Sequence, residues 1–298
     1  MGGRGGNAPA LSSKQLFRGG DDRLRKNTFI REKSLEGRGC RYKDVEWFEY
    51  SEEEQQAVRQ ARRTRSRASP PKIKKLNDKR SRQYAEWLVQ NNFGSGDYHV
   101  TLTYDENHVT DKERAKKDFV NYIQRLKRLY RKNGLKLKYF YVYEGRAQGA
   151  RPHFHLICNG GVSRDEIEER WKCGNVNCDR LRENQKGLAE IARYLTKAMG
   201  RTSTCERSWN CSANLKRPDR VVDDNSVSRQ GMRKMQEARR NDEVKEIVER
   251  IYKGWRLIDY DVGENDVTGR QYVRLKLIRK ENRRLSHSGA IRGQFDPP

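Results

Sequence analysis

Two kinds of hydrophobic periodicity alternate through the middle of the chain. Apolar and polar side chains alternate over residues 98–104, which predicts a strand with one buried face and one polar face. Residues 138–144 and 153–158 show strand patterns too, and the short loop between them makes these two strands antiparallel neighbours. Residues 174–181 form a fourth, weaker strand.

Helical periodicity fills the segments between these strands. Thr110-x-x-Glu113 fits a capping box that opens a helix, whose apolar stripe runs as far as Tyr130. Ser163-x-x-Glu166 fits a second capping box, at the start of a shorter helix. The predicted order is therefore β-α-β-β-α-β, the split βαβ arrangement of ferredoxin-like domains.

This order defines the fold class that we expect: α+β, with a ferredoxin-like or RRM-like central antiparallel sheet. Two helices on one face of such a sheet leave the other face open for a ligand. Two more helices flank the unit, at residues 81–92 before it and 187–199 after it. On the second of these, Tyr194 lies at the edge of the buried stripe, and Lys197 follows on the same flank one turn later.

The remaining sequence divides at changes in composition. Residues 1–80 are Gly-rich and then rich in charged side chains, so we expect a basic and largely flexible region with little apolar surface to bury. The predicted α+β domain occupies residues 81–220. Residues 221–280 form a C-terminal extension with a charged helix, over residues 231–253, and then a hairpin. Residues 281–298 form a polar, flexible tail.

The charge of the chain indicates its partner. Its 65 Lys and Arg residues exceed its 41 Asp and Glu residues, which gives a formal net charge of +24 and a pI near 9.9. An excess of this size favours a polyanion, and nucleic acid fits better than a membrane because the chain has no long apolar run. The first residues lack the apolar core of a secretory signal, so we expect a soluble, cytoplasmic protein without a membrane partner.

The six cysteines are few for a chain of 298 residues, which is typical of a reducing compartment rather than of a disulfide framework. Four of them could form a structural Zn²⁺ site: Cys173, Cys178, Cys205 and Cys211. Neither pair has the two-residue spacing of a zinc knuckle, and Cys178 falls in a predicted strand. Free, partly buried thiols are the favoured interpretation.

A catalytic metal site is predicted where the second and third strands meet. His153 and His155 lie two residues apart, so their imidazoles share one face of a strand and can hold one divalent cation. Glu144, at the end of the neighbouring strand, can bring a carboxylate to the same ion. Two histidines and a carboxylate with open positions suit Mg²⁺ or Mn²⁺ in a catalytic site. The alternative is a solvated strand face with incidental histidines.

Tyr194 would supply a nucleophile beside such a metal. A phenol ordinarily has a pKa of about 10 and needs a positive neighbour to react as phenoxide at neutral pH. Lys197 or the metal can provide that charge, and the metal can also stabilise charge that develops on a scissile phosphate. The alternative is an ordinary boundary tyrosine with a lysine that extends to solvent.

Three segments of the chain resemble a known family. HVTLTY at residues 99–104, RPHFHLI at 151–157 and ARYLTKAM at 192–199 resemble the three successive motifs of HUH replication initiators. The resemblance is strongest to rolling-circle initiators of small single-stranded DNA phages (microvirus-like) and of related prophage or plasmid elements. It covers roughly residues 98–200.

The resemblance implies a metal-dependent, site-specific nicking and strand-transfer enzyme that starts rolling-circle DNA replication. His153 and His155 would be metal ligands, with Glu144 as the third. Tyr194 would attack the DNA and leave a 5′-phosphotyrosine and a free 3′-OH. Lys197 would correspond to the lysine that commonly follows the nucleophile in this family.

The partner that the resemblance implies is a single-stranded DNA origin, presented in a hairpin, in the cytoplasm of a bacterial host. Thr101, Thr103, Arg151 and Arg193 would lie near this DNA. The sequence contains no Gly-rich loop that ends in Gly-Lys-Ser/Thr, so unwinding would come from a host helicase and extension from a host polymerase.

Two alternatives stay open. An HUH relaxase or a single-strand transposase shares the metal–tyrosine chemistry but moves DNA elsewhere. A non-catalytic, RRM-like nucleic-acid-binding module could instead stack bases on Tyr139, Tyr141 and Tyr143, which share one face of a strand. The paired histidines and the absence of an RNP-like Gly-Phe signature weigh against this module.

Overall fold

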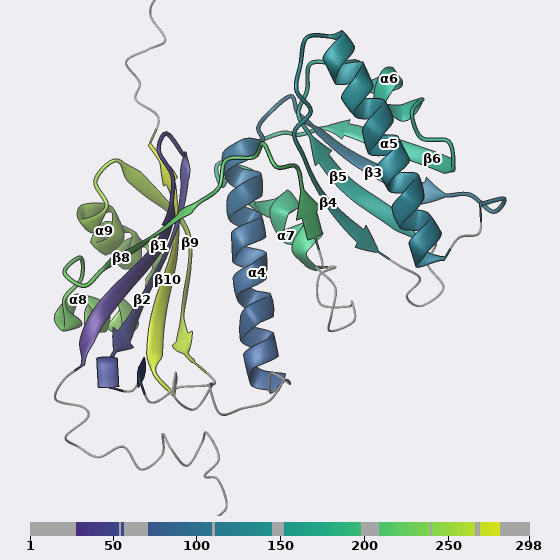
Figure 1. Ribbon diagram of the computed structural model, residues 1–298. Coiled ribbons are helices and arrows are strands. Elements are labelled where there is room, and N and C mark those ends of the chain that lie inside the picture. The colour runs from purple at the N-terminus through teal and green to yellow at the C-terminus, as the bar shows by residue number, and fades with distance from the viewer. Residues whose placement is uncertain are drawn as a thin grey trace, which may run out of the picture.

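The computed structural model describes most of the chain between residues 28 and 280. The described ranges are 28–53, 55–56, 71–108, 111–144, 152–197, 209–238, 240–265 and 269–280, with the backbone alone for residues 71–75 and 197. Within these ranges the protein is α+β, with two five-stranded antiparallel sheets and six helices. Figure 1 shows the two sheets with the long helix α4 between them.

The first sheet contains the predicted ferredoxin-like unit. Its elements follow the expected order: β3 (Tyr98–Tyr104), α5 (Lys112–Lys132), β4 (Tyr139–Glu144), β5 (His153–Cys158), α6 (Arg164–Glu168) and β6 (Gly174–Arg180). The strands lie side by side as β6-β3-β5-β4, and the short strand β7 (Trp209–Cys211) pairs with β4. All these pairings are antiparallel, so the predicted fold class is confirmed.

Alternation along the strands separates the two faces of the first sheet. Helix α5 packs its apolar stripe on one face, where Phe119 stacks on Phe154 with 4.4 Å between the ring centroids. Helices α4 (Pro71–Asn92) and α7 (Ala189–Lys197) pack on the other face, around Ile157. The face that we expected to be open is therefore partly covered by the two flanking helices.

The two predicted capping boxes have different outcomes. Ser163 caps α6 as expected, because its hydroxyl accepts from the N–H of Glu166 and the Glu166 carboxylate accepts from the N–H of Ser163. The box that Thr110 would open is wrong: Asp111 caps α5 and accepts a hydrogen bond of 2.7 Å from the N–H of Arg114. Asp is as good an N-cap as Thr, so the sequence offers two adjacent positions at which the helix could start. Thr110 itself lies outside the described residues.

The second sheet corrects the prediction for the N-terminal region. Residues 29–50, which we expected to be flexible, form β1 (Phe29–Glu36) and β2 (Tyr42–Tyr50). The sheet has the order β8-β1-β2-β10-β9. Its other strands come from the far end of the chain: β8 (Asp219–Asp223), β9 (Trp255–Glu264) and β10 (Gln271–Arg279). The predicted C-terminal hairpin is present as β9 and β10, but it forms one sheet with the N-terminal strands.

The second sheet also has its own core. Trp47 is fully buried in β2, and the helices on this face contribute Met235 and other apolar residues. The buried carboxylate of Glu32 accepts a hydrogen bond of 2.6 Å from the hydroxyl of Tyr252. Glu32 shows how a charged residue in these strands can be buried, because Trp47 and Tyr252 both donate hydrogen bonds to its carboxylate.

The single charged helix that we predicted over residues 231–253 is wrong. The segment forms two helices, α8 (Arg229–Glu237) and α9 (Asn241–Ile251). Ala238 follows α8 with a ψ of 125°, which is outside the helical region. Acidic residues in the first turn of α9 favour a new start there, because negative charge interacts well with the N-terminal end of the helix dipole.

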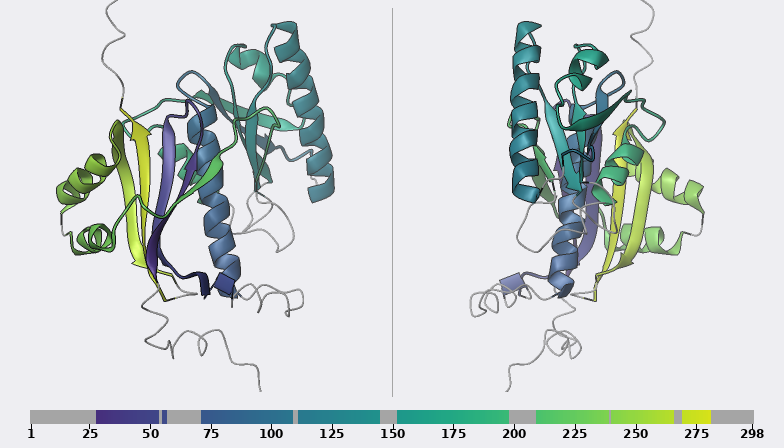
Figure 2. Two further views of the ribbon diagram at one scale, coloured as in Figure 1. Left: turned by 60° about the vertical axis from the view of Figure 1, so that its left-hand side comes forward. Right: turned by 90° about the vertical axis from the view of Figure 1, so that its right-hand side faces the viewer.

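Helix α4 joins the sheets because it has two apolar faces. Trp87 packs with Tyr42 of the second sheet, whereas Ala85 and Val89 pack on the first sheet. The helix starts at Pro71, well before the predicted start, and proline suits the first helical position because it has no N–H to leave unpaired. Two further views in Figure 2 show α4 in the same central position.

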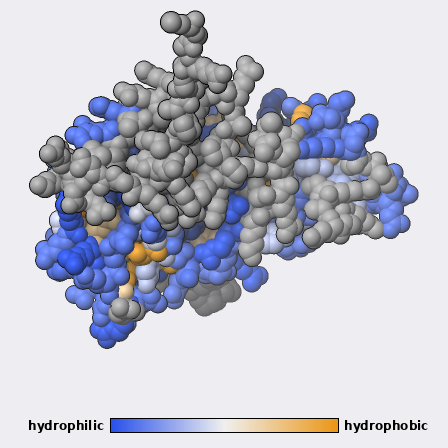
Figure 3. Space-filling view, turned by 90° about the horizontal axis from the view of Figure 1, so that it is seen from below, coloured by the Kyte–Doolittle hydropathy of each residue, from blue (hydrophilic) through white to orange (hydrophobic). Residues whose placement is uncertain are grey.

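Charged residues make up 36% of the chain, a composition that favours a hydrophilic surface. Seen from below in Figure 3, the described part of this face is mostly blue and has only small apolar areas. None of the helices in the described part of the chain combines the length and apolar composition needed to cross a bilayer.

Candidate metal centre and nucleophile

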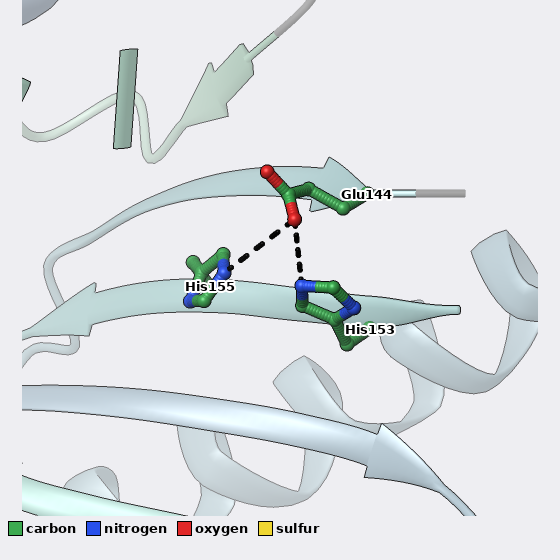
Figure 4. A group of neighbouring side chains, drawn as sticks. All are labelled: Glu144, His153 and His155. Atoms are coloured by element: carbon green, nitrogen blue, oxygen red, sulfur yellow. Dashed lines mark ion pairs between the residues drawn. The ribbon is translucent and has the colours of Figure 1, made fainter. Parts of the chain in front are cut away.

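The sheet register brings the three predicted metal ligands together. Glu144 and His153 are directly opposite each other on β4 and β5, and His155 follows two residues later on the same face. The carboxylate Oε2 of Glu144 lies 2.7 Å from Nε2 of His153 and 4.0 Å from Nε2 of His155. Figure 4 shows the three side chains converging on one point. One ligand atom from each residue lies within 4.8 Å of the others.

The environment of His155 suits a metal ligand. Its side chain is 4% exposed, and its Nε2 atom is buried without a hydrogen-bond partner. Burial, with His153 and His99 nearby, lowers the pKa of His155 to about 4, so the imidazole is neutral at neutral pH. A buried, neutral imidazole nitrogen beside a carboxylate leaves a lone pair for a cation. The group is compatible with a divalent metal ion.

Thr101 orients His155 from the neighbouring strand. The two residues are opposite each other on β3 and β5, and the Thr101 hydroxyl lies 3.3 Å from Nδ1 of His155. A partner at Nδ1 fixes the ring and directs Nε2 toward Glu144, which is how a supporting hydrogen bond prepares a histidine to bind metal. Thr101, predicted as a DNA contact, lies instead against a candidate metal ligand.

We predict that Thr101→Val weakens Mn²⁺ binding by roughly tenfold or more, because supporting hydrogen bonds typically contribute that much to metal affinity. Isothermal titration with Mn²⁺ measures the change. Thr103→Val is the matched control, since Thr103 lies on the same face of β3 and opposite His153. Equal affinities in the two variants would mean that Thr101 does not orient the ligand.

Tyr194 lies beside this group. It projects from α7 with 52% of its side chain exposed, and its ring centroid is 5.3 Å from that of His155. The apolar stripe of α7, which includes Leu195, packs on the sheet and fixes the helix next to β5. A cavity of about 390 Å³ opens next to Tyr194, between α7 and the end of β6. An exposed phenol therefore lies between the candidate metal ligands and an open cavity.

His99 is a residue of this site to which the sequence analysis assigned no role. Its ring stacks on His155 with 5.5 Å between centroids and meets the edge of Tyr194 at 6.3 Å. Its Nε2 is buried without a partner, and burial lowers its pKa. The available signal was the strand alternation, which places His99 on the same face as Thr101.

The other residues that the sequence predicted for the site lie at different distances from the metal group. Thr103 lies on the same face as the metal group, opposite His153. Arg193 points toward the second sheet, where it forms an ion pair of 3.2 Å with Asp259 and lines a separate cavity of about 280 Å³. Lys197 ends α7, three residues after Tyr194, with only its backbone described. Arg151 lies outside the described residues.

The four-cysteine zinc site is wrong. Cys178 lies in β6 and Cys211 in β7, at opposite edges of the first sheet. Four strand spacings of about 4.8 Å separate these edges, so the two thiols are roughly 19 Å apart and cannot share a tetrahedral ion. Cys205 lies outside the described residues, and Cys173 is a free, half-buried thiol.

The tyrosines that a base-stacking module would use do not lie on the face of the metal group. Tyr139, Tyr141 and Tyr143 are half-buried against the core beneath α5. Tyr141 contacts Phe119 of that helix, with 4.1 Å between ring centroids. Rings packed in this way do not form an open stacking platform.

These observations define an antiparallel α+β domain with a group compatible with a divalent metal beside an exposed tyrosine. Residues 97–199, from β3 to just beyond α7, match the family model described as Replication-associated protein ORF2/G2P. The match covers about a third of the chain and supports a role as a replication initiator, whose partner is DNA. Neither a curated protein nor a solved structure matches the chain.

Proposed function

We propose that the protein is a metal-dependent, site-specific nicking and strand-transfer enzyme that starts rolling-circle DNA replication. One observation carries the proposal: Tyr194 lies beside Glu144, His153 and His155, with 5.3 Å between the rings of Tyr194 and His155. In combination with the match to a replication-associated family, this arrangement favours an HUH initiator of a phage or a related element over a binding module.

Each residue has a role in the proposed reaction. Glu144, His153 and His155 would hold a divalent cation, which would supply positive charge for a scissile phosphate. The hydroxyl oxygen of Tyr194 attacks phosphorus and releases its proton to water. The P–O3′ bond breaks as the O–P bond forms, and the departing 3′ oxygen takes up a proton. Lys197, one turn after Tyr194, balances the negative charge of the phosphate.

The products explain why a tyrosine suits initiation. The 5′-phosphotyrosine keeps the energy of the phosphodiester bond, so a later 3′-OH can displace the phenol and rejoin the strand. The free 3′-OH serves as the primer for a host polymerase, behind a host helicase. The substrate is a single-stranded origin presented in a hairpin, in the cytoplasm of a bacterial host, and Thr103 and Arg151 contact this DNA.

The experiment that tests this proposal uses end-labelled, single-stranded oligonucleotides that tile the DNA encoding the protein. With Mn²⁺, the 3′-labelled strand is expected to form an SDS-resistant adduct, and the 5′-labelled strand is expected to yield a free fragment that ends in 3′-OH. Excess EDTA removes both products. Trypsin cuts after Arg193 and Lys197, so mass spectrometry should find the nucleotide on the peptide of residues 194–197. Adducts on the 5′-labelled strand, or on another peptide, would overturn the proposal.

A further inference from the structure

The C-terminal half of α5 and the loop after it carry a dense group of positive charges. Between residues 119 and 138 the sequence has seven Lys and Arg residues and no Asp or Glu. Five of these cations are exposed, and we call them the outer basic face: Lys127, Arg128, Arg131, Lys132 and Lys136. The first half of α5 has exposed cations too, Arg114, Lys116 and Lys117, whereas the neighbouring helix α6 carries acidic residues.

The cations of the outer basic face are not used to hold the fold together. Among the described residues, none of the five side chains forms an ion pair or a hydrogen bond. The first turns of the same helix differ, since Lys116 pairs with Glu113 at 3.0 Å and Arg114 pairs with Asp118 at 3.1 Å. Charges without partners on such a face are available to a ligand.

Helix stability does not account for this arrangement. Lys127 and Arg131 are four residues apart, as are Arg128 and Lys132, and like charges at this spacing destabilise a helix. The helix dipole favours cations in the last turn, which accounts for Arg131 and Lys132 but not for Lys127 and Arg128. The repulsion between Lys127, Arg128 and the last turn of α5 requires another explanation.

The outer basic face and the metal centre lie on opposite sides of the first sheet. Helix α5 covers one face of that sheet, and α7 with Tyr194 covers the other. Figure 1 shows α5 and α7 separated by the strands. The nucleotides held at Tyr194 are therefore a different stretch of DNA from any that contacts the outer basic face.

The side chains of the helix indicate the kind of ligand. The aromatic residues of α5, Phe119, Tyr122 and Tyr130, are all buried toward the sheet, so the outer face has no ring on which an unpaired base could stack. Sites for single strands typically combine such rings with cations. A face with cations alone matches duplex DNA, which carries one phosphate charge per roughly 1.7 Å of its axis.

We propose that the outer basic face of α5 binds the phosphates of double-stranded DNA and holds a duplex on the side of the first sheet away from Tyr194. This inference goes beyond nicking, because it needs neither the nucleophile nor a metal. A second contact of this kind would keep the protein on the duplex next to its origin while one strand occupies the metal centre.

The test is fluorescence anisotropy with a short labelled duplex and with one of its strands alone. Changing all five residues of the outer basic face to Ala should weaken duplex binding at least tenfold at low salt. The slope of log affinity against log salt should fall by about 0.9 for each lost phosphate contact. Binding of the single strand to Tyr194→Phe should not change when the five substitutions are added.

The matched control removes five exposed cations from α8, α9 and the turn after them: Arg233, Lys234, Lys245, Arg250 and Lys253. It lowers the net charge of +24 by the same amount. Equal losses of duplex affinity in the two variants would overturn the inference, since net charge alone would then explain binding. An equal loss for duplex and single strand would overturn the assignment to duplex DNA. Formation of the tyrosine adduct, measured in the same variants, reports separately on the nicking proposal.

Discussion

Tyr194→Phe is expected to abolish the covalent protein–DNA adduct, with a fall in nicking of at least about 10³-fold, because the substitution removes the only atom that attacks phosphorus in the proposed reaction. The side chain is 52% exposed, so loss of the hydroxyl should leave the fold intact. Mn²⁺ affinity should also stay unchanged, because in the proposed reaction the ion is held by Glu144, His153 and His155. Gel assays with 3′-labelled single-stranded DNA measure the adduct.

Tyr143→Phe is the matched control. Tyr143 precedes Glu144 in β4, but its ring packs on Phe154 on the α5 side of the sheet, with 4.8 Å between centroids. This variant should form the adduct at the rate of the unmodified protein. If Tyr194→Phe still forms an adduct, another residue is the nucleophile. If Tyr143→Phe loses the adduct to the same extent, the loss is not specific to the Tyr194 hydroxyl.

The ferredoxin-like unit was predictable because its signals are local. Alternation fixed the limits of β3 and β5, and the short β4–β5 loop required an antiparallel pair. That register places Glu144 opposite His153, so the candidate metal centre followed from strand pairing and residue chemistry together. His99 was missed because its role depends on a ring contact with Tyr194, from a helix far along the chain.

The second sheet was not predictable in the same way, since its pairings are not local. Strand β2 pairs with β10, which lies more than 200 residues later, as in the pair of Trp47 and Val273. The charged composition of residues 29–50 also suggested a segment with little to bury. Glu32 is nevertheless buried, because Trp47 and Tyr252 both donate hydrogen bonds to its carboxylate. Composition measures how many polar groups a segment contains, whereas folding depends on whether the buried ones find partners.

Trp47→Ala is expected to destabilise the protein by about 3–5 kcal/mol, the usual cost of removing a large aromatic side chain from a core. Trp47 is fully buried, its ring stacks on Tyr252 at 6.2 Å, and its indole N–H donates to the Tyr252 hydroxyl at 2.9 Å. Urea unfolding followed by circular dichroism measures the loss. Glu49→Ala, at an exposed position of the same strand, should shift stability by less than about 0.5 kcal/mol. An unchanged unfolding midpoint for Trp47→Ala would mean that residues 29–50 behave as a flexible basic arm and do not contribute to the fold. The expected loss of stability would mean that the N-terminal strands belong to the folded unit, which positions α4 against the sheet that carries the candidate metal ligands.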